Sequence, residues 1–277
     1  MKKRISSRLY HYCSIESFFN ITKSKSIWLS NSDQMNDSNE NIWIERHFET
    51  LKNSFKSEKE KKLLKEGLDT YKWNKNPPFI FCLSANKDLL SQWRAYSQDG
   101  QGVSIGFNTK CLEFENRIPS PNVYAQHTFG LAKVDYNNYS QKKIVNDLCD
   151  EVKKMAESSE KFEKMFSSIH LGLSLVSNAL VFKNSNFREE KEWRIIHTPT
   201  EKYEESLENL SELRYRYSEN RIKSYFEYEF GTKFNSNLIP EIILGPKCNM
   251  QISEMENFIK SVGLKKTKVL RSNSTYR

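Results

Sequence analysis

Hydrophobic positions along the chain predict short strands separated by helices. The segment "RLYHYCS", which begins at Arg8, is expected to form the first strand, because aromatic side chains surround His11. A helix is expected next, since Ser14 can cap it and Ile15, Phe18 and Thr22 recur at helical spacing. Further strands are expected at "IWL", "FIFCLS", "VSIGFN" and "KEWRIIH", and the tail from 239 onward predicts strand, turn, helix and strand.

Three charged stretches carry apolar positions at helical spacing, and we expect them to be helical insertions at about 42–73, 141–182 and 203–228. No internal repeat and no Gly-, Ser- or Pro-rich linker divides the chain. Residues 1–277 are therefore predicted to form a single α+β domain. Its small mixed or antiparallel central sheet would be surrounded by several long helices.

Composition narrows the class of protein. Apolar residues make up 37% of the chain and include 17 Phe, 13 Tyr and 5 Trp, which is enough to build a core. The net charge of +8 permits a nucleic-acid partner without requiring one. The five cysteines are scattered and form no CxxC, which argues against a disulfide framework or a zinc site and favours the cytoplasm. Neither a signal-peptide pattern nor an apolar run of membrane-spanning length is present, so no membrane association is expected.

The sharpest candidate for chemistry is "FREEKEWRIIH", at 187–197. If this segment is a strand, Glu190, Glu192 and Arg194 share one face, and Trp193 and Ile195 share the other. Two carboxylates about 7 Å apart could stabilise a cationic transition state at a sugar carbon and accept a proton. Burial would require partners such as Arg194, Arg188 or His11. The alternative is a charged edge strand that discourages aggregation.

Other candidate residues have equally ordinary alternatives. His11 could hydrogen-bond to a sugar hydroxyl or could be a core histidine satisfied by the backbone. Ser84 ends an apolar strand, where its hydroxyl could hold a ribose or cap a turn. Trp93 and Tyr96 are three residues apart, so on a helix they would share a face, either in the core or as a stacking wall for a planar ring.

Taken in order, these motifs resemble the bacterial domain-of-unknown-function family numbered 2971. The resemblance extends over most of the chain, and "FIFCLSANKDLLSQWRAYSQDGQGVSIGFN", "VDY", "FREEKEWRII" and "EIILGPK" follow one another in the order typical of that family. The positions that match are Asn36, Asp37 and Glu40, then Trp93, Tyr96, Gly102 and Phe107, then Glu190, Glu192, Trp193 and Arg194.

The opening "LYHYCSIESFFNITKSKSIWLS" is also similar to the start of ADP-ribosyltransferase-like domains, including the DNA-modifying toxin group. That resemblance implies NAD as a substrate, no metal, and a nucleic acid or protein as the acceptor. It makes Glu192 the catalytic carboxylate with Glu190 assisting. The implied cofactor-binding residues are His11 at the nicotinamide ribose, Trp93 or Tyr96 against the nicotinamide, and Ser84 and Arg194.

Two alternatives stay open from the residues. Glu189 and Lys191 have the Glu-x-Lys spacing of a metal-dependent nuclease, with Asp37 or Asp135 as a second metal ligand. A non-enzymatic module, whose basic helices contact nucleic acid or another partner, is the other alternative. The family resemblance suggests a toxin or phage-defence role, and the sequence indicates no oligomeric state.

Overall fold

The computed structural model describes residues 6–35, 40–120, 125–199, 207–218 and 220–276. The strands of this part of the chain are β1 (Arg8–Cys13), β2 (Ser26–Asn31), β3 (Phe79–Ser84), β4 (Val103–Asn108), β5 (Phe129–Lys133), β6 (Glu192–His197), β7 (Arg214–Ser218), β8 (Arg221–Glu229), β9 (Glu241–Leu244) and β10 (Lys268–Arg271). The α-helices are α1 (Ile15–Ser24), α2 (Phe48–Ser54), α3 (Glu58–Asn74), α4 (Leu90–Tyr96), α5 (Thr109–Leu112), α6 (Asn138–Glu157), α7 (Lys161–Ala179) and α8 (Ile252–Ser261). Short 3-10 helices include η2 (Glu40–His47) and η4 (Ser185–Glu190).

All ten of these strands join one sheet, in the order β10-β9-β4-β1-β3-β2-β8-β7, with β6 also on β3 and β5 on β6. Pairing is antiparallel except between β9 and β10, which are parallel. The mixed sheet and the long helices confirm the predicted α+β class. The sheet is larger than the small one expected, because hairpin and tail strands extend both of its sides.

The sheet forks at β3. One edge of β3 pairs with β6 along its whole length, from Phe79↔His197 to Ser84↔Glu192. Two strands share the other edge: β2 pairs at the start of β3, where Ser30 faces Ile80, and β1 pairs at its end, where Tyr10 faces Ser84. The described pairings do not join β1 to β2, so an opening is left between them beside the middle of β3.

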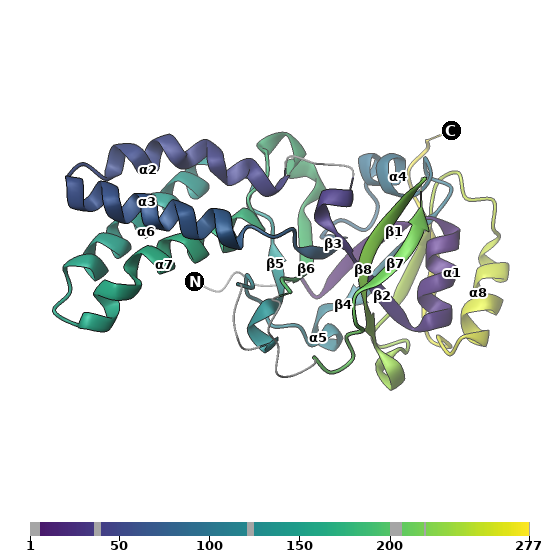
Figure 1. Cartoon of the computed structure of the whole chain (residues 1–277). Helices are drawn as coiled ribbons and strands as arrows, with labels where there is room; N and C mark the ends of the chain where they lie inside the picture. The colour runs from purple at the N-terminus through teal and green to yellow at the C-terminus, as the bar shows by residue number, and fades with distance from the viewer. Residues whose placement is uncertain (1–5, 36–39, 121–124, 200–206, 219, 277) are drawn as a thin grey trace.

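Four helices extend from one side of the sheet. Helices α2, α3, α6 and α7 pack together at one end of the molecule, while α1 and α8 lie at the other (Figure 1). Helix α3 approaches α7 closely at two glycines. A Cβ on Gly67 would lie 2.6 Å from a methyl carbon of Leu171, and a Cβ on Gly172 would lie 2.5 Å from Cβ of Thr70. Glycine is therefore required at both positions for this approach.

The two faces of the central strands contribute to different cores. Phe79, Phe81 and Leu83 of β3 point into a core that β1, β2, β4, β9 and α8 complete. Ile80 and its cross-strand partner Ile196 point the other way, into a core built with the four extended helices. Alternation along β3 thus places apolar side chains on both faces, as expected of a central strand.

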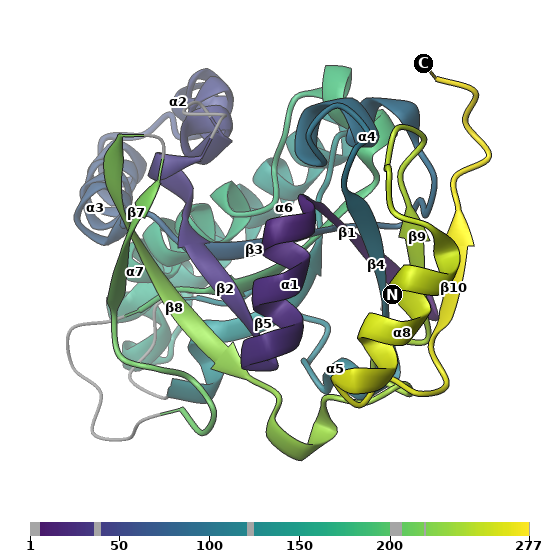
Figure 2. The same cartoon turned by 90° about the vertical axis from the view of Figure 1, so that its right-hand side faces the viewer.

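The predicted helix at 203–228 is wrong over its described part. Residues 214–218 and 221–229 form the two strands of the β7–β8 hairpin, which lies at the edge of the sheet beyond β2 (Figure 2). Pairing of β8 with β2, from Ser26↔Glu229 to Ser30↔Tyr225, stabilises the extended backbone, and Asn220 turns the hairpin with a φ of 59°. The alternation in "RYRYS" already had the period of a strand.

The other two insertions are helical but interrupted. The stretch 42–73 contains most of η2, all of α2 and most of α3, and 141–182 contains most of α6 and all of α7. Ser57 begins α3 through a capping box with Glu60, which explains the break before it. Asn36 and Asp37, which matched the family motif, lie outside the described residues, as does the side chain of Glu40.

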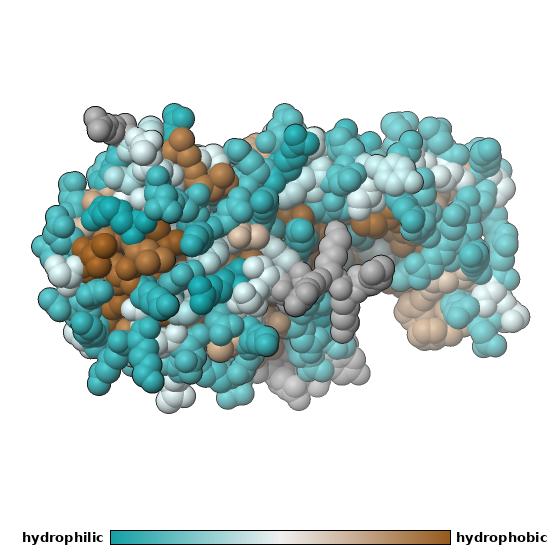
Figure 3. Space-filling model, turned by 180° about the vertical axis from the view of Figure 1, so that it is seen from behind, coloured by the Kyte–Doolittle hydropathy of each residue, from teal (hydrophilic) through white to brown (hydrophobic). Residues whose placement is uncertain are grey.

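Most of the surface seen from behind is hydrophilic, and hydrophobic residues gather toward the end that carries α8 and β10 (Figure 3). Within the described ranges, no helix has both the length and the apolar character that crossing a membrane requires.

Candidate functional site

A cavity of about 270 Å³ opens at the fork of the sheet. Strands β1, β2 and β3, helix α4, the β7–β8 hairpin and the segment before β6 all contribute to its wall. Among its lining residues are Tyr10, His11, Tyr12, Trp28, Ser30, Gln34, Cys82, Ser84, Gln92, Tyr96, Lys183, Glu190, Glu192, Arg216 and Lys223.

The polar end of the cavity follows from the register of β3 and β6. On one face of this strand pair, Ile80 faces Ile196, whereas Ser84 faces Glu192 four residues further along. The face therefore changes from apolar, under the helices, to polar at the end of β3. Glu192 and Arg194 share this face and Trp193 and Ile195 lie in the opposite core, as the alternation predicted.

Glu190 lies on a different element from the one expected. It is not on the strand, because β6 begins at Glu192 and Glu190 ends the 3-10 helix η4. Lys191 connects the two in a left-handed conformation, with a φ of 45°. Ser84 Oγ donates to the carbonyl oxygen of Glu190 at 2.6 Å, and the Ala85 N–H donates to the carbonyl oxygen of Lys191 at 3.1 Å. The turn is thereby attached to the end of β3, and both carboxylates line the same cavity.

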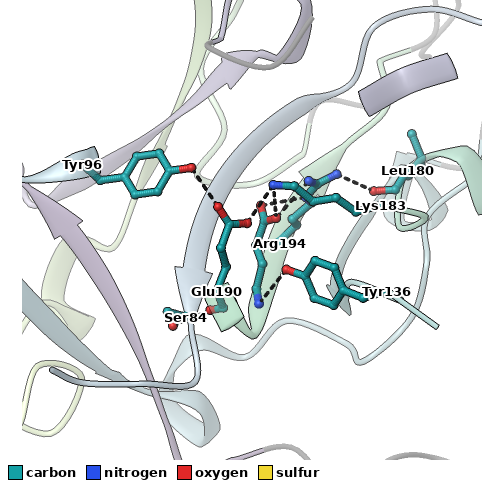
Figure 4. Close-up of polar contacts among 8 residues, drawn as sticks. Ser84, Tyr96, Tyr136, Leu180, Lys183, Glu190 and Arg194 are labelled. Carbon is teal, nitrogen blue, oxygen red and sulfur yellow. Dashed lines mark hydrogen bonds and ion pairs between the residues drawn. The ribbon is translucent and has the colours of Figure 1, made fainter. Parts of the chain in front are cut away.

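Two cations bind these carboxylates (Figure 4). Lys183 Nζ lies 2.8 Å from Glu190 Oε2 and 3.1 Å from Glu192 Oε2. Arg194 donates two hydrogen bonds to the Glu192 carboxylate, from Nε at 2.8 Å and from Nη2 at 3.0 Å. Its Nη1 donates to the Leu180 carbonyl oxygen. The four side chains are 2–12% exposed, so each charge is both buried and paired.

The environments move the pKa values of the two carboxyl groups in opposite directions. Burial raises the pKa of Glu190, and the nearby Lys183 ammonium only partly offsets it. Burial would also raise the pKa of Glu192, but the Arg194 guanidinium and the Lys183 ammonium outweigh it and hold that pKa well below its usual range. Glu190 therefore takes up a proton more readily than Glu192 does.

His11 lies where the sheet opens. Its position in β1 places it on the face opposite Tyr10, stacked on Phe81 at 4.1 Å between ring centroids, and it lines the cavity through the fork. The distance from Nδ1 to the Cys82 carbonyl oxygen is 2.9 Å, so Nδ1 carries the proton and Nε2 is an acceptor. Burial lowers the pKa of His11 to about 4, against a smaller opposing effect of that hydrogen bond, so the ring is neutral.

Of the predicted aromatic pair, only Tyr96 reaches the cavity. Its hydroxyl donates to Glu190 Oε1 at 3.1 Å. Trp93 is 0% exposed, packs against Tyr12, donates from Nε1 to Asp88 and is not part of the cavity lining. The expectation that Trp93 stacks on a ligand is therefore wrong, because α4 turns that side chain into the core below β1.

The Glu-x-Lys pair of the nuclease alternative does not lie on a strand. Glu189 and Lys191 precede β6 and are exposed. In the ranges that the structure describes, no group of three or more His, Cys, Asp or Glu side chains could hold a metal ion. Asp135 accepts from the Asn137 N–H, and Asp37 lies outside those ranges.

Lys183 and Tyr136 belong to the site but were given no role from the sequence, although Tyr136 ends the "VDY" motif of the family resemblance. Lys183 follows the apolar run "ALVF" directly, and a lysine at the end of a buried run is a signal that could have indicated it. The Tyr136 hydroxyl accepts a hydrogen bond from the Glu192 N–H at 3.2 Å and so supports the first residue of β6.

The fold and the cavity define an α+β protein with a ligand-sized cavity at the fork of a mixed sheet, polar where β3 ends. Residues 92–195 match the family model described as "Protein of unknown function (DUF2971)", which confirms the predicted family over that segment. The matched segment includes Tyr96, Lys183 and both carboxylates of the site. No curated protein and no solved structure matches the chain.

Proposed function

We propose that the protein transfers ADP-ribose from NAD to a macromolecular acceptor, with the reaction taking place at the Glu190 end of the cavity. The observation that carries this proposal is that His11, Tyr96 and the neighbouring pair Glu190 and Glu192, drawn from three separate segments of the chain, line one cavity. These are the residue types that the resemblance to ADP-ribosyltransferase-like domains implies for NAD.

Each residue has a role that its surroundings support. His11 Nε2 would accept a hydrogen bond from a ribose hydroxyl. Tyr96, which is about half exposed, offers its ring to the nicotinamide while its hydroxyl orients Glu190. Glu192, held by Arg194 and Lys183, is a fixed negative charge close to the developing cation.

Glu190, rather than Glu192, has the properties of a proton acceptor. Both Glu192 oxygens receive hydrogen bonds from cationic groups, and its low pKa makes it a weak base. In the proposed step, the bond between ribose C1′ and nicotinamide breaks and its electron pair leaves with nicotinamide. The acceptor's nucleophile bonds to C1′, and its proton passes to Glu190.

The test measures nicotinamide release and transfer of labelled ADP-ribose with protein and nucleic-acid acceptors. We expect Glu190→Gln to lower transfer about 10²–10⁴-fold, the usual contribution of general acid–base catalysis. Glu189→Gln, a matched change at an exposed neighbour, should leave transfer unchanged. Absence of nicotinamide release from the wild-type protein, or equal activity of the Glu190→Gln variant, would overturn the proposal and favour a non-enzymatic binding module.

A further inference from the structure

Gln92 lines the cavity with a side-chain amide that has no hydrogen-bond partner. The residue belongs to α4, is 8% exposed and is part of the cavity lining. Among the residues that the structure describes, none forms a hydrogen bond with this amide, and neither its nitrogen nor its oxygen is sealed from solvent. The amide is therefore open to a molecule that enters the cavity.

Gln141, the other glutamine that is buried in the described part of the chain, shows how such a group is normally satisfied. Its NH₂ donates to the carbonyl oxygens of Asp135 and Lys183. Its Oε1 accepts from Trp43 Nε1 at 3.2 Å. A buried amide without such partners costs free energy. A ligand that offers Gln92 both an acceptor and a donor would remove this cost.

Gln92 lies one helical turn before Tyr96. Residues four apart on a helix share a face and are about 6 Å apart along the axis. Tyr96 lines the same cavity, and its hydroxyl donates to Glu190 Oε1 at 3.1 Å (Figure 4). The unpartnered amide is therefore close to the carboxylate end of the cavity.

The charges at this end favour a neutral ligand group beside Gln92. Two anions, Glu190 and Glu192, are paired with two cations, Lys183 and Arg194, so these four charges balance. A primary carboxamide is neutral and can form two hydrogen bonds with a glutamine amide, one in each direction. A carboxylate has no donor, so one of its oxygens would face Gln92 Oε1 and be repelled.

We propose that Gln92 binds the carboxamide of nicotinamide, while the Tyr96 ring contacts the pyridine ring. The assignment of the ligand to nicotinamide rests on the proposed function, which places the reacting ribose at Glu190. The amide-binding position on α4 rests on Gln92 itself. Two hydrogen bonds to the carboxamide orient the pyridine ring and select an amide against the corresponding acid.

NMR titration that observes the ligand, with nicotinamide, nicotinic acid and adenosine as probes, tests the proposal without any reaction. Adenosine is included because the adenine edge also presents a neighbouring donor and acceptor. We expect the wild-type protein to bind nicotinamide about tenfold more tightly than nicotinic acid. Gln92→Met keeps a similar length and removes both hydrogen-bonding groups. It should raise the nicotinamide dissociation constant about tenfold or more and lose most of the preference for the amide.

Gln101→Met is the matched control, because Gln101 is exposed and does not line the cavity. Its binding of nicotinamide should equal that of the wild type. Since Gln92→Met breaks no hydrogen bond within the protein, it should unfold in urea at the same concentration as the wild type or a higher one. A much lower midpoint would contradict the unpartnered state of Gln92.

The outcomes separate the two proposals. The role of Gln92 is overturned if the wild type does not bind nicotinamide, if Gln92→Met binds it equally well, or if adenosine is the probe that depends on Gln92. Each of these results counts against Gln92 even when the protein releases nicotinamide from NAD. Nicotinamide binding that depends on Gln92, together with no nicotinamide release from NAD, supports the role of Gln92 and overturns the proposed reaction.

Discussion

The Lys183 ammonium lies 2.8 Å from Glu190 Oε2 and joins Glu190 to the Glu192–Arg194 ion pair. Lys183 follows the end of α7, whereas the carboxylates flank the start of β6. One lysine therefore attaches the helical end of the molecule to the sheet at the polar end of the cavity.

Replacing this lysine should destabilise the fold. In Lys183→Met, Glu190 loses the ammonium that binds its carboxylate, and Glu192 keeps its ion pair with Arg194. Breaking a buried ion pair on one side costs about 3–5 kcal/mol, so the free energy of unfolding at pH 7 should fall by about that amount. Urea denaturation measures it, with exposed Lys191→Met as the control. A loss no larger than that of the control would contradict the pairing described.

The effect on the free energy of unfolding should depend on pH in opposite ways when Glu192 and Glu190 are each replaced by glutamine. Glu192 has a lowered pKa, so its ionised form stabilises the fold above the unfolded-state pKa of about 4.3, and this stability is lost as pH falls through the folded-state pKa. Glu192→Gln should therefore be most destabilising at pH 7 and approach the wild type in strong acid. Unfolding free energies measured from pH 7 down to pH 3 test this.

Glu190 has a raised pKa, so its ionised form is less favourable in the folded state than in the unfolded chain. Relative to the wild type, Glu190→Gln should thus be more stable at pH 7 than at pH 4, the reverse of Glu192→Gln. If both variants respond to pH in the same direction, the assignment of a proton-accepting and a permanently ionised carboxylate is wrong.

His11 should remain neutral well below its ordinary pKa. Its folded-state pKa of about 4 means that the unfolded chain takes up a proton first as pH falls below 6.5. The fold then loses stability between pH 6.5 and pH 4, on the order of 1–2 kcal/mol by pH 5. Nitrogen NMR should show a single neutral tautomer, protonated at Nδ1, down to about pH 5. Protonation near pH 6.5 would contradict burial of the ring.

The left-handed turn at Lys191 should favour glycine. A non-glycine residue with a φ of 45° is strained by about 1–2 kcal/mol, and glycine is not. Lys191→Gly should therefore be at least as stable as Lys191→Ala. At exposed Lys164 in α7, the same comparison should favour alanine by about 1 kcal/mol. Thermal or urea unfolding of the four variants provides the comparison. Greater stability of the alanine variant at both positions would contradict the left-handed conformation of residue 191.

Local sequence patterns determined many of the strands and helices of this protein and the residues that line its cavity. The strands "FIFCLS" and "VSIGFN", the helix after Ser14 and the opposite faces of Glu192 and Trp193 all follow from periodicity and capping, because these depend on neighbours within a few residues. Residues His11, Ser84, Tyr96, Glu190 and Glu192 were also selected by their types and positions in those patterns, and all five line the cavity.

Tertiary structure alone decided how these pieces meet. The cavity exists because β1 and β2 share one edge of β3, and no local pattern specifies strand order. Glu190 arrives through a left-handed turn, Lys183 from the end of another segment, and Arg216 from a hairpin that resembled a charged helix. Trp93 turned into the core because its neighbours in space, Tyr12 and Asp88, are set by packing. Pairings between residues distant in the chain depend on register and burial, which the period of a single segment does not contain.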